Sequence, residues 1–301
     1  MNYELTTLLV IGGGYLVLLF AVAYFTDKGW VPSKLVNHPI VYVLSLGVFA
    51  SIWAYYTSIG NALREGYGYL AQSIGISLAF LFSPLLLKPI LELTKSHQLS
   101  SLADLMAFRY RSPWAGTITT LVILIGVTPL IALQIRAVAD TANILASSTD
   151  RGSIAFIFCI LITLFAILFG TSTQDGRTRH DGLLMAIAFE SLVKLIAYLA
   201  VGAFAIFGVF GSFEGLNEWL ISRQDLVQTL KETDYLSSFH MMTLLFFSAS
   251  VAMPHMFYVT FNENNTNNNL SAASWGLPLY FLLLSLPVLP ILWAGIKADT
   301  G

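Results

Sequence analysis

Eight long apolar stretches, separated by short polar loops, run through the whole chain. They occupy residues 5–25, 40–62, 69–93, 114–146, 154–171, 182–211, 238–261 and 272–296. A membrane-spanning α-helix needs about 20 predominantly apolar residues to cross the hydrocarbon of a bilayer. The pattern therefore predicts an all-α, polytopic membrane protein with about eight transmembrane helices, in which residues 1–301 form a single transmembrane domain.

Two of these stretches predict departures from a straight span. The stretch 114–146 is long for one crossing at about 1.5 Å of rise per residue, so we expect it to tilt or to extend beyond the bilayer. The stretch 272–296 contains Pro278, Pro287 and Pro290. We expect kinks there, because proline removes a backbone hydrogen bond of the helix.

Three shorter segments also carry a structural prediction. In the loop 94–113, Ser101 can cap a short helix together with Asp104. The loop 212–237 has the pattern of one or two short amphipathic helices. The three glycines at 12–14 lie inside the first stretch, where small residues favour close packing between helices.

The composition supports a membrane protein and excludes several classes of function. Hydrophobic residues make up 56% and charged residues 11% of the chain, against roughly a quarter charged in ordinary globular domains. The net charge of -2 gives no argument for a nucleic-acid partner. The single cysteine, Cys159, allows no disulfide within one chain. No phosphate-binding loop and no His-Glu-x-x-His motif occurs, and the five histidines show no ligand spacing.

The distribution of Lys and Arg predicts the orientation in the membrane. Loops that carry more of them lie in the cytoplasm. With the N-terminus outside, the inner loops hold Lys28, Lys34, Lys88, Lys95, Arg109, Arg111, Arg177 and Arg179. The outer segments hold Arg64, Arg136, Arg151, Arg223, Lys231 and Lys297. The bias favours an outside N-terminus. A cleaved signal peptide is the alternative for the first stretch, but the residues before it carry Glu4 and no basic residue.

The stretch 40–62 carries the first candidate functional residues. Its middle mixes small, hydroxyl and aromatic side chains, among them Ser51, Trp53, Tyr56 and Ser58. Such a composition suits a helix interrupted at mid-membrane, where free carbonyls and hydroxyls can hold a cation beside an organic substrate. The alternative is a continuous, tightly packed helix.

Two further stretches contain polar residues at membrane depth. Glu190 and Lys194 lie four residues apart on one helix face and can pair, either as an ion-coupling element or as a structural pair. In the segment 253–258, Pro254 frees a backbone carbonyl one turn back. His255 can then contact a substrate or a proton, or it can be a satisfied interior residue. Near the outer end of 114–146, Arg136 and Asp140 are expected to pair with each other.

Three motifs give the chain a resemblance to a known family. They are the segments 51–60 (Ser-Ile-Trp-Ala-Tyr-Tyr-Thr-Ser-Ile-Gly), 100–104 with 109–112, and 186–195 (Ala-Ile-Ala-Phe-Glu-Ser-Leu-Val-Lys-Leu). In these segments, and in its overall pattern, the chain resembles the sodium/solute symporter family, which has the LeuT-like inverted-repeat fold. It looks most like the N-terminal membrane domain of symporter-type sensor histidine kinases.

The resemblance implies a substrate site between two broken helices. Segment 40–62 would be the first core helix and 238–261 the sixth. One side of the pocket would then carry Ser51, Trp53, Tyr56 and Ser58, and the other Pro254, His255, Phe257 and Tyr258. The related sensors have Pro-Arg-Gln-Phe where this chain has Pro254-His255-Met256-Phe257. The loss of that arginine removes a bidentate donor for a carboxylate and leaves the substrate open.

The resemblance also implies an incomplete fold. Core helices eight to ten of the family are absent from the sequence, so we expect a C-terminally truncated form that cannot cycle as a coupled transporter by itself. Sodium is the ion that the resemblance suggests, and the missing eighth core helix normally supplies hydroxyls to its site. No other cofactor is expected.

Three functions remain open from the sequence. The first is transport or sensing of a small solute, such as an amino acid or a carboxylate, in the inner membrane of a bacterium. The second is a sensory input module of a two-component system, whose histidine kinase would lie beyond residue 301 and act on a response regulator. The third is a membrane scaffold without a solute. No catalytic residue is assigned within the chain.

Overall fold

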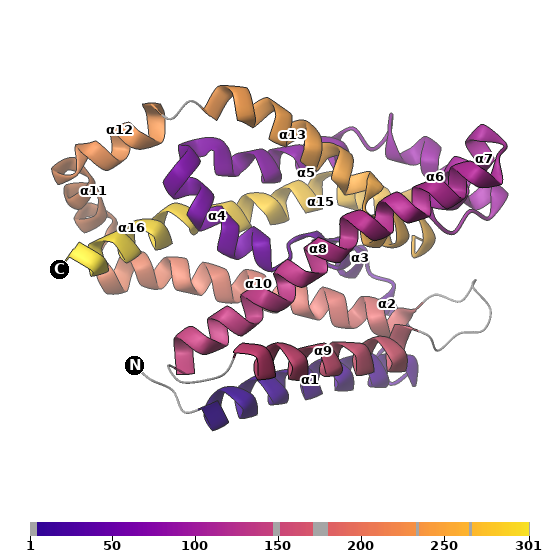
Figure 1. The fold of residues 1–301 in the computed structure, drawn as a ribbon, viewed down its shortest axis with the longest axis horizontal. Coiled ribbons are helices and arrows are strands. Elements are labelled where there is room, and N and C mark those ends of the chain that lie inside the picture. The colour runs from indigo at the N-terminus through magenta and orange to yellow at the C-terminus, as the bar shows by residue number, and fades with distance from the viewer. Residues whose placement is uncertain (1–4, 147–150, 171–179, 233–234, 265–266, 301) are drawn as a thin grey trace.

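The computed structural model describes residues 5–146, 151–170, 180–232, 235–264 and 267–300, and every regular element within these ranges is helical (Figure 1). This confirms the predicted all-α class. In chain order the first half contains α1 (Leu5–Asp27), α2 (Ser33–Val36), α3 (Pro39–Leu46), η1 (Gly47–Phe49), α4 (Ile52–Glu65), η2 (Gly66–Tyr69), α5 (Leu70–Leu81), α6 (Leu87–His97), α7 (Leu102–Tyr110) and α8 (Pro113–Ala146).

The second half is helical in the same way, and the η labels mark short 3-10 or π turns. It contains α9 (Arg151–Gly170), α10 (Asp181–Phe204), η3 (Ala205–Val209), α11 (Phe213–Ser222), α12 (Gln224–Glu232), α13 (Tyr235–Ala252), α14 (Pro254–Phe257), η4 (Tyr258–Asn262), α15 (Asn267–Ser285) and α16 (Val288–Thr300).

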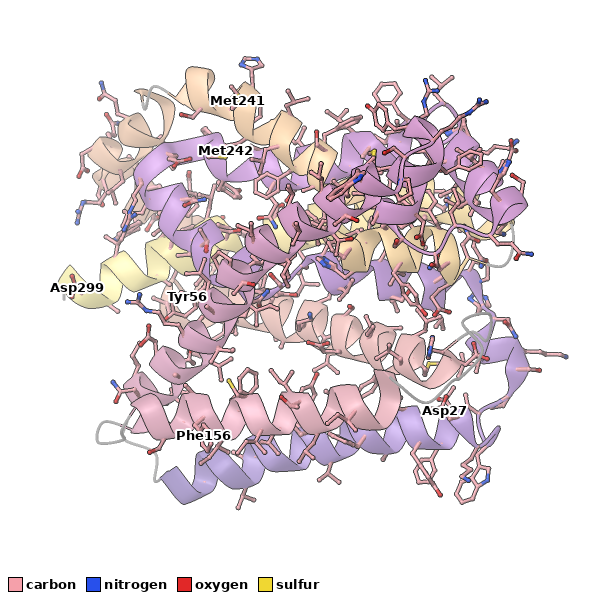
Figure 2. The ribbon with its side chains drawn as sticks, turned by 45° about the vertical axis from the view of Figure 1, so that its right-hand side comes forward. Asp27, Tyr56, Phe156, Met241, Met242 and Asp299 are labelled. Carbon is pink, nitrogen blue, oxygen red and sulfur yellow. The ribbon has the colours of Figure 1, made fainter. Side chains whose placement is uncertain are left out.

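The described residues contain four helical segments that are long and apolar enough to cross a membrane, or six if each of two bent pairs is counted as one span. The chain is thus a multi-pass membrane protein. The start of α1 and the end of α16 lie at the same end of the molecule (Figure 1), and Asp27 and Asp299 lie at opposite ends (Figure 2). An even number of passes gives this arrangement. The four to six spans found among the described residues are fewer than the predicted eight.

The prediction of a single helix over 69–93 differs from the structure. The chain there forms α5 and α6, which are separated by turns between Leu81 and Leu87. Pro84 lies in this break and has no N–H to donate to a helix. The stretch 154–171 is found in α9, whose described apolar part is shorter, Gly152–Leu164.

Two spans are broken, as the sequence predicted. The helical segments Pro39–Phe49 and Ala54–Leu81 are bent by 56° about the residues that join them. The segments Ser238–Ala252 and Pro254–Asn262 are bent by 55°. The last stretch is interrupted at Pro287, between α15 and α16, whereas Pro278 lies within α15.

The buried core lies between α3, α5, α13 with α14, and α15. Its largest fully buried side chains include Tyr42, Leu46, Phe80, Phe257 and Phe281. Close packing of such side chains, rather than exclusion of water, holds helices together within a bilayer. Outside this core α1 packs along α10, and α8 packs against α9.

The outer helices present apolar side chains to their surroundings. Leu124 and Ile125 of α8 are exposed, as is Phe156 of α9, which is labelled in Figure 2. Hydrocarbon tails can surround such surfaces, because the exposed side chains are apolar and the backbone groups within the helix are paired internally. These faces fit contact with a lipid bilayer.

The shorter segments confirm two predictions and correct one. Ser101 caps α7 by accepting a hydrogen bond from the Asp104 N–H at 3.1 Å. The predicted loop 212–237 contains the short helices α11 and α12, and α13 begins near its end, at Tyr235. Close packing at the glycines of α1 was predicted wrongly, because a Cβ atom at Gly12, Gly13 or Gly14 would meet nothing within 4 Å in the described structure. Arg177 and Arg179 lie outside the described residues.

Candidate functional site

The first helix break leaves one backbone carbonyl without its helical partner. In a continuous helix the Ala54 N–H would donate to the Ala50 carbonyl. Instead it donates to the Ser51 carbonyl at 2.8 Å, and the Ser51 N–H donates to the Phe49 carbonyl at 2.9 Å. Ser51 itself is extended, with φ -80° and ψ -178°. The Ala50 carbonyl is therefore available to a side chain or an ion.

Side chains from two other helices complete the break. Lys194 of α10 donates from Nζ to the Ala50 carbonyl oxygen at 3.1 Å. On the other side, the Ile52 N–H at the start of α4 donates to Gln134 Oε1 of α8 at 3.2 Å. An unpaired backbone group inside a bilayer costs several kcal/mol. These two contacts thus explain how the chain can be interrupted at this depth.

Lys194 also forms the predicted pair with Glu190. The distance from Nζ to Oε1 is 3.2 Å, and the two side chains are 23% and 38% exposed. The ammonium group therefore bridges a carboxylate on its own helix and a carbonyl at the break. The structural pair is observed, and a role in ion coupling stays a prediction.

A glycine allows α10 to approach the break this closely. A Cβ atom at Gly47 would lie 2.8 Å from Ser191 Oγ and 3.1 Å from Tyr280 Cζ. The Tyr280 hydroxyl donates to the Ser191 carbonyl at 3.1 Å. Ser191 lies between Glu190 and Lys194 in sequence, so this contact fixes the height at which the ion pair meets the break.

The second break lies beside the first. Pro254 begins α14 and lacks the N–H that would continue α13, and Met253 before it is extended with φ -67° and ψ 132°. The ring of His255 lies 6.5 Å from that of Phe49, which ends η1. The structure thus brings together the two interruptions that were predicted 200 residues apart in the sequence.

A small polar cavity lies next to the first break, between α4, α5, α10 and α15. Its volume is about 10 Å³, roughly the space for one water molecule. It is lined by Ala54, Tyr55, Ser58, Tyr69, Gln72, Ser73, Tyr198, Phe281, Leu284, Ser285 and Val288. The buried atoms Gln72 Nε2 and Tyr198 Oη have no hydrogen-bond partner among the described residues. Such atoms favour a bound water or the polar part of a solute.

The candidate residues of the first broken helix are only partly brought together. Ser58 lines the cavity, and its hydroxyl donates to the Ala54 carbonyl. The buried hydroxyl of Ser51 has no partner among the described residues. Tyr56 is 51% exposed and does not line the cavity. The side chain of Trp53 lies outside the described ones, so its place in a pocket stays a prediction.

The candidate residues of the second broken helix are dispersed. His255 and Pro254 are partly buried near the break. Phe257 is 1% exposed and belongs to the apolar core. Tyr258 contacts His180, at the start of α10.

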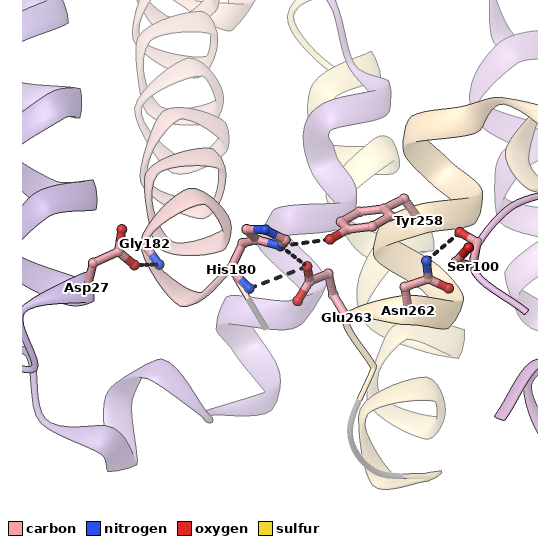
Figure 3. Close-up of polar contacts among 7 residues, drawn as sticks. All are labelled: Asp27, Ser100, His180, Gly182, Tyr258, Asn262 and Glu263. Carbon is pink, nitrogen blue, oxygen red and sulfur yellow. Dashed lines mark hydrogen bonds and ion pairs between the residues drawn. The ribbon is translucent and has the colours of Figure 1, made fainter. Parts of the chain in front are cut away.

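Tyr258 belongs to a polar cluster that the sequence did not predict (Figure 3). Its hydroxyl lies 2.7 Å from His180 Nδ1, and the same nitrogen lies 3.0 Å from Glu263 Oε1. Glu263 is 2% exposed. The cluster joins the start of α10 to the end of η4. Nearby, Asn262 donates to the Ser100 carbonyl, which ties η4 to the loop before α7.

A second, open hollow lies between α8 and α9. Its volume is about 500 Å³, and its lining includes Arg136 and Asp140. These two residues form the predicted pair, with 3.5 Å between Arg136 Nε and Asp140 Oδ2. Arg136 is largely exposed, so this hollow is a surface feature of the outer helices. Among the described residues no group of three or more His, Cys, Asp or Glu side chains is arranged to hold a metal ion.

Comparison with known proteins gives one relative to report. A protein of Bacillus subtilis (strain 168) that is named "Uncharacterized symporter YhjB" is 23% identical to the chain over 227 residues. The match covers 73% of this chain and 43% of the relative, so the chain spans less than half of the relative's length. No family model matches the chain, and no solved structure matches it.

Proposed function

We propose that the chain is the solute-binding membrane domain of a symporter-like transporter. The observation that carries this proposal is the pair of interrupted helices whose breaks lie side by side, with a polar cavity next to them. Discontinuous helices of this kind form the substrate and ion sites of many secondary transporters. The distant similarity to a protein named as a symporter supports the same function.

The solute would bind beside the first break, in contact with α4 and α5. Ser58, Gln72 and Tyr198 supply hydroxyl and amide groups there, which suit a small polar solute such as an amino acid or a carboxylate. The cavity holds only about one water in this structure, so a solute of several atoms needs α4 and α15 to move apart. Movement of one helix bundle against another would then alternate access to the two sides of the membrane.

Several finer features belong to the same proposal. They are the LeuT-like arrangement of the fold, a bacterial inner-membrane location, and Trp53, Tyr56, Pro254 and His255 as further residues that meet the solute when the pocket opens. Sodium is the ion that the sequence resemblance suggests.

The first experiment is a search for the solute. Purified chain in detergent micelles is heated with each of the standard amino acids and with small mono- and dicarboxylates, and the melting temperature is recorded. Any solute that raises it is then offered to proteoliposomes in an uptake assay. We expect one chemical class to stabilise the protein.

The variant Gln72→Leu tests whether a stabilising solute binds in the cavity or stabilises the protein unspecifically. It removes the buried amide but retains most of the side-chain volume, so stabilisation by the solute should be lost. The matched control is Gln224→Leu, because Gln224 is exposed at the start of α12. If no solute stabilises the chain, or if both variants lose it equally, the proposed site is wrong. Binding without uptake would favour a sensory module that acts on a downstream kinase and response regulator.

A further inference from the structure

The first break has the chemistry of a cation site. The Ala50 carbonyl ends the η1 turn and points its oxygen at Lys194 Nζ, 3.1 Å away, and the carboxylate of Glu190 lies 3.2 Å from the same nitrogen. The C-terminal end of a helical segment carries partial negative charge, which favours a cation. In transporters with discontinuous helices, unwound carbonyls of this kind coordinate sodium or a proton.

We propose that the Ala50 carbonyl and the Glu190 carboxylate form a monovalent-cation site, and that the ammonium group of Lys194 is its built-in occupant. The ammonium donates one N–H to each oxygen. It carries the same charge as a sodium ion and stays attached to α10. The break is therefore neutralised and hydrogen-bonded without an exchangeable ion at this position.

The surroundings of the pair fit this assignment. Lys194 is held at the height of the break because Gly47 lets α10 pack against η1. Glu190 lies one turn before Lys194, the orientation in which a carboxylate and an ammonium pair best on a helix. The side chains are 23% and 38% exposed, so the site is not sealed. A free ion can enter it once the ammonium is removed.

The inference can be tested without a known solute and without a transport assay, because occupation of the site by a cation changes the thermal stability of the protein. Wild type, Lys194→Met and the double variant Lys194→Met/Glu190→Gln are heated in detergent in sodium chloride and in choline chloride at equal ionic strength. Methionine retains the apolar stem and removes the charge. The measured quantity is the difference in melting temperature between the two salts.

We expect Lys194→Met to melt several degrees below wild type in choline, because an unpaired carboxylate and an unpaired carbonyl remain. Sodium should recover part of this loss by filling the site, and the recovery should disappear in the double variant. A sodium effect in Lys194→Met that is no larger than in wild type overturns the proposal.

A matched control is available in the same chain. Lys297 also donates from Nζ to a backbone carbonyl, that of Val209 at 2.9 Å, but its ammonium lies 4.7 Å from the ring centroid of Phe210. Lys297→Met should lose stability without gaining a sodium effect. If it gains one as large as that of Lys194→Met, the effect is unspecific and the proposal is wrong.

A direct binding measurement covers the case in which Lys194→Met does not fold in either salt. Radioactive sodium is then titrated onto wild type and onto Glu190→Gln. Absence of a sodium site that requires Glu190 supports the proposal. Sodium bound by wild type and lost in Glu190→Gln overturns it, because an exchangeable ion would then hold the position.

Discussion

Gln134 is the residue on which the start of α4 depends most directly. Its Oε1 accepts the Ile52 N–H at 3.2 Å, a donor that no helical carbonyl can reach. Gln134→Leu keeps the volume and removes the acceptor, so we expect the free energy of unfolding to fall by about 1–3 kcal/mol. Reversible unfolding in mixed micelles measures this change. Gln134→Glu retains an acceptor and should recover at least part of it; equal losses in both variants would contradict the assigned role.

Asp104 gives a pH-dependent prediction at the residue scale. Burial raises the pKa of this carboxyl, but hydrogen bonds from Ser100 and Ser101 lower it by more, so the net pKa lies below the ordinary value of 3.8. The Ser100 hydroxyl and N–H donate to Asp104 Oδ2 at 2.7 and 3.1 Å. A carboxyl with a lowered pKa stabilises the fold above its unfolded pKa, and this stabilisation is lost as the pH falls through the folded pKa.

Hydrogen exchange of the α7 amides tests this prediction. At neutral pH, Asp104→Asn should show lower protection than wild type, after correction for intrinsic exchange. The difference should shrink as the pH falls below 3.8 and disappear only once the pH is below the lowered pKa of the folded state, where the wild-type carboxyl is also neutral. Glu92→Gln is the control, because the Glu92 carboxylate is exposed and makes only a long contact, 4.0 Å, with the ammonium group of Lys88. A difference that persists in acid would show that charge is not the cause.

At the scale of elements, the contact between η1 and α10 is set by Gly47. An alanine there would place a Cβ atom 2.8 Å from Ser191 Oγ and 2.9 Å from Ser191 Cβ. We expect Gly47→Ala to push the two elements apart and to cost about 1–3 kcal/mol. The displacement would also lengthen the Lys194 contact with Ala50. Gly60→Ala is the matched control in α4, because its Cβ would meet nothing within 4 Å; comparable losses at both positions would contradict the packing argument.

The sequence predicted where helices break but not what completes the breaks. The mixed composition around Ser51 and the proline at 254 mark the interruptions locally, and the spacing of Glu190 and Lys194 marks their pairing. The Lys194 contact with Ala50 joins residues 144 positions apart, and the Gln134 contact with Ile52 joins residues 82 apart. Such contacts depend on how each helix is rotated about its axis, which hydropathy does not determine.

The polar cluster at His180 could not be predicted from the sequence for a similar reason. Its histidine and its partner Glu263 lie 83 positions apart, and the histidines of the chain show no ligand spacing. The sequence around Glu263 is rich in asparagine, a composition typical of a polar turn. That Glu263 is buried becomes visible only when α10 and η4 are packed together. Side chains that join separate elements are thus the part of the site that the sequence could not give.

At the scale of the whole molecule, the charges are divided between two ends. One end of the molecule holds the close of α1 and the start of α8, and to it belong Lys28, Lys95, Arg109 of α7 and Arg111, which follows α7. The helices α11 and α12 and the close of α16 lie at the other end (Figure 1). The bias of Lys and Arg predicts that the first of these ends faces the cytoplasm. The polar cluster of His180, Tyr258 and Glu263 lies at this end, so it would act on the cytoplasmic side of the proposed solute path.

Cysteine labelling tests this orientation. Cys159 is first replaced by serine. Single cysteines are then introduced as Lys28→Cys, directly after α1, and as Asn217→Cys on α11, both at exposed positions. In intact spheroplasts, a membrane-impermeant maleimide should label Asn217→Cys, and it should label Lys28→Cys only after lysis. The opposite result would place the N-terminus inside and the His180 cluster outside. Labelling after lysis is the control for both variants, because the reagent then reaches both sides of the membrane and should label both cysteines.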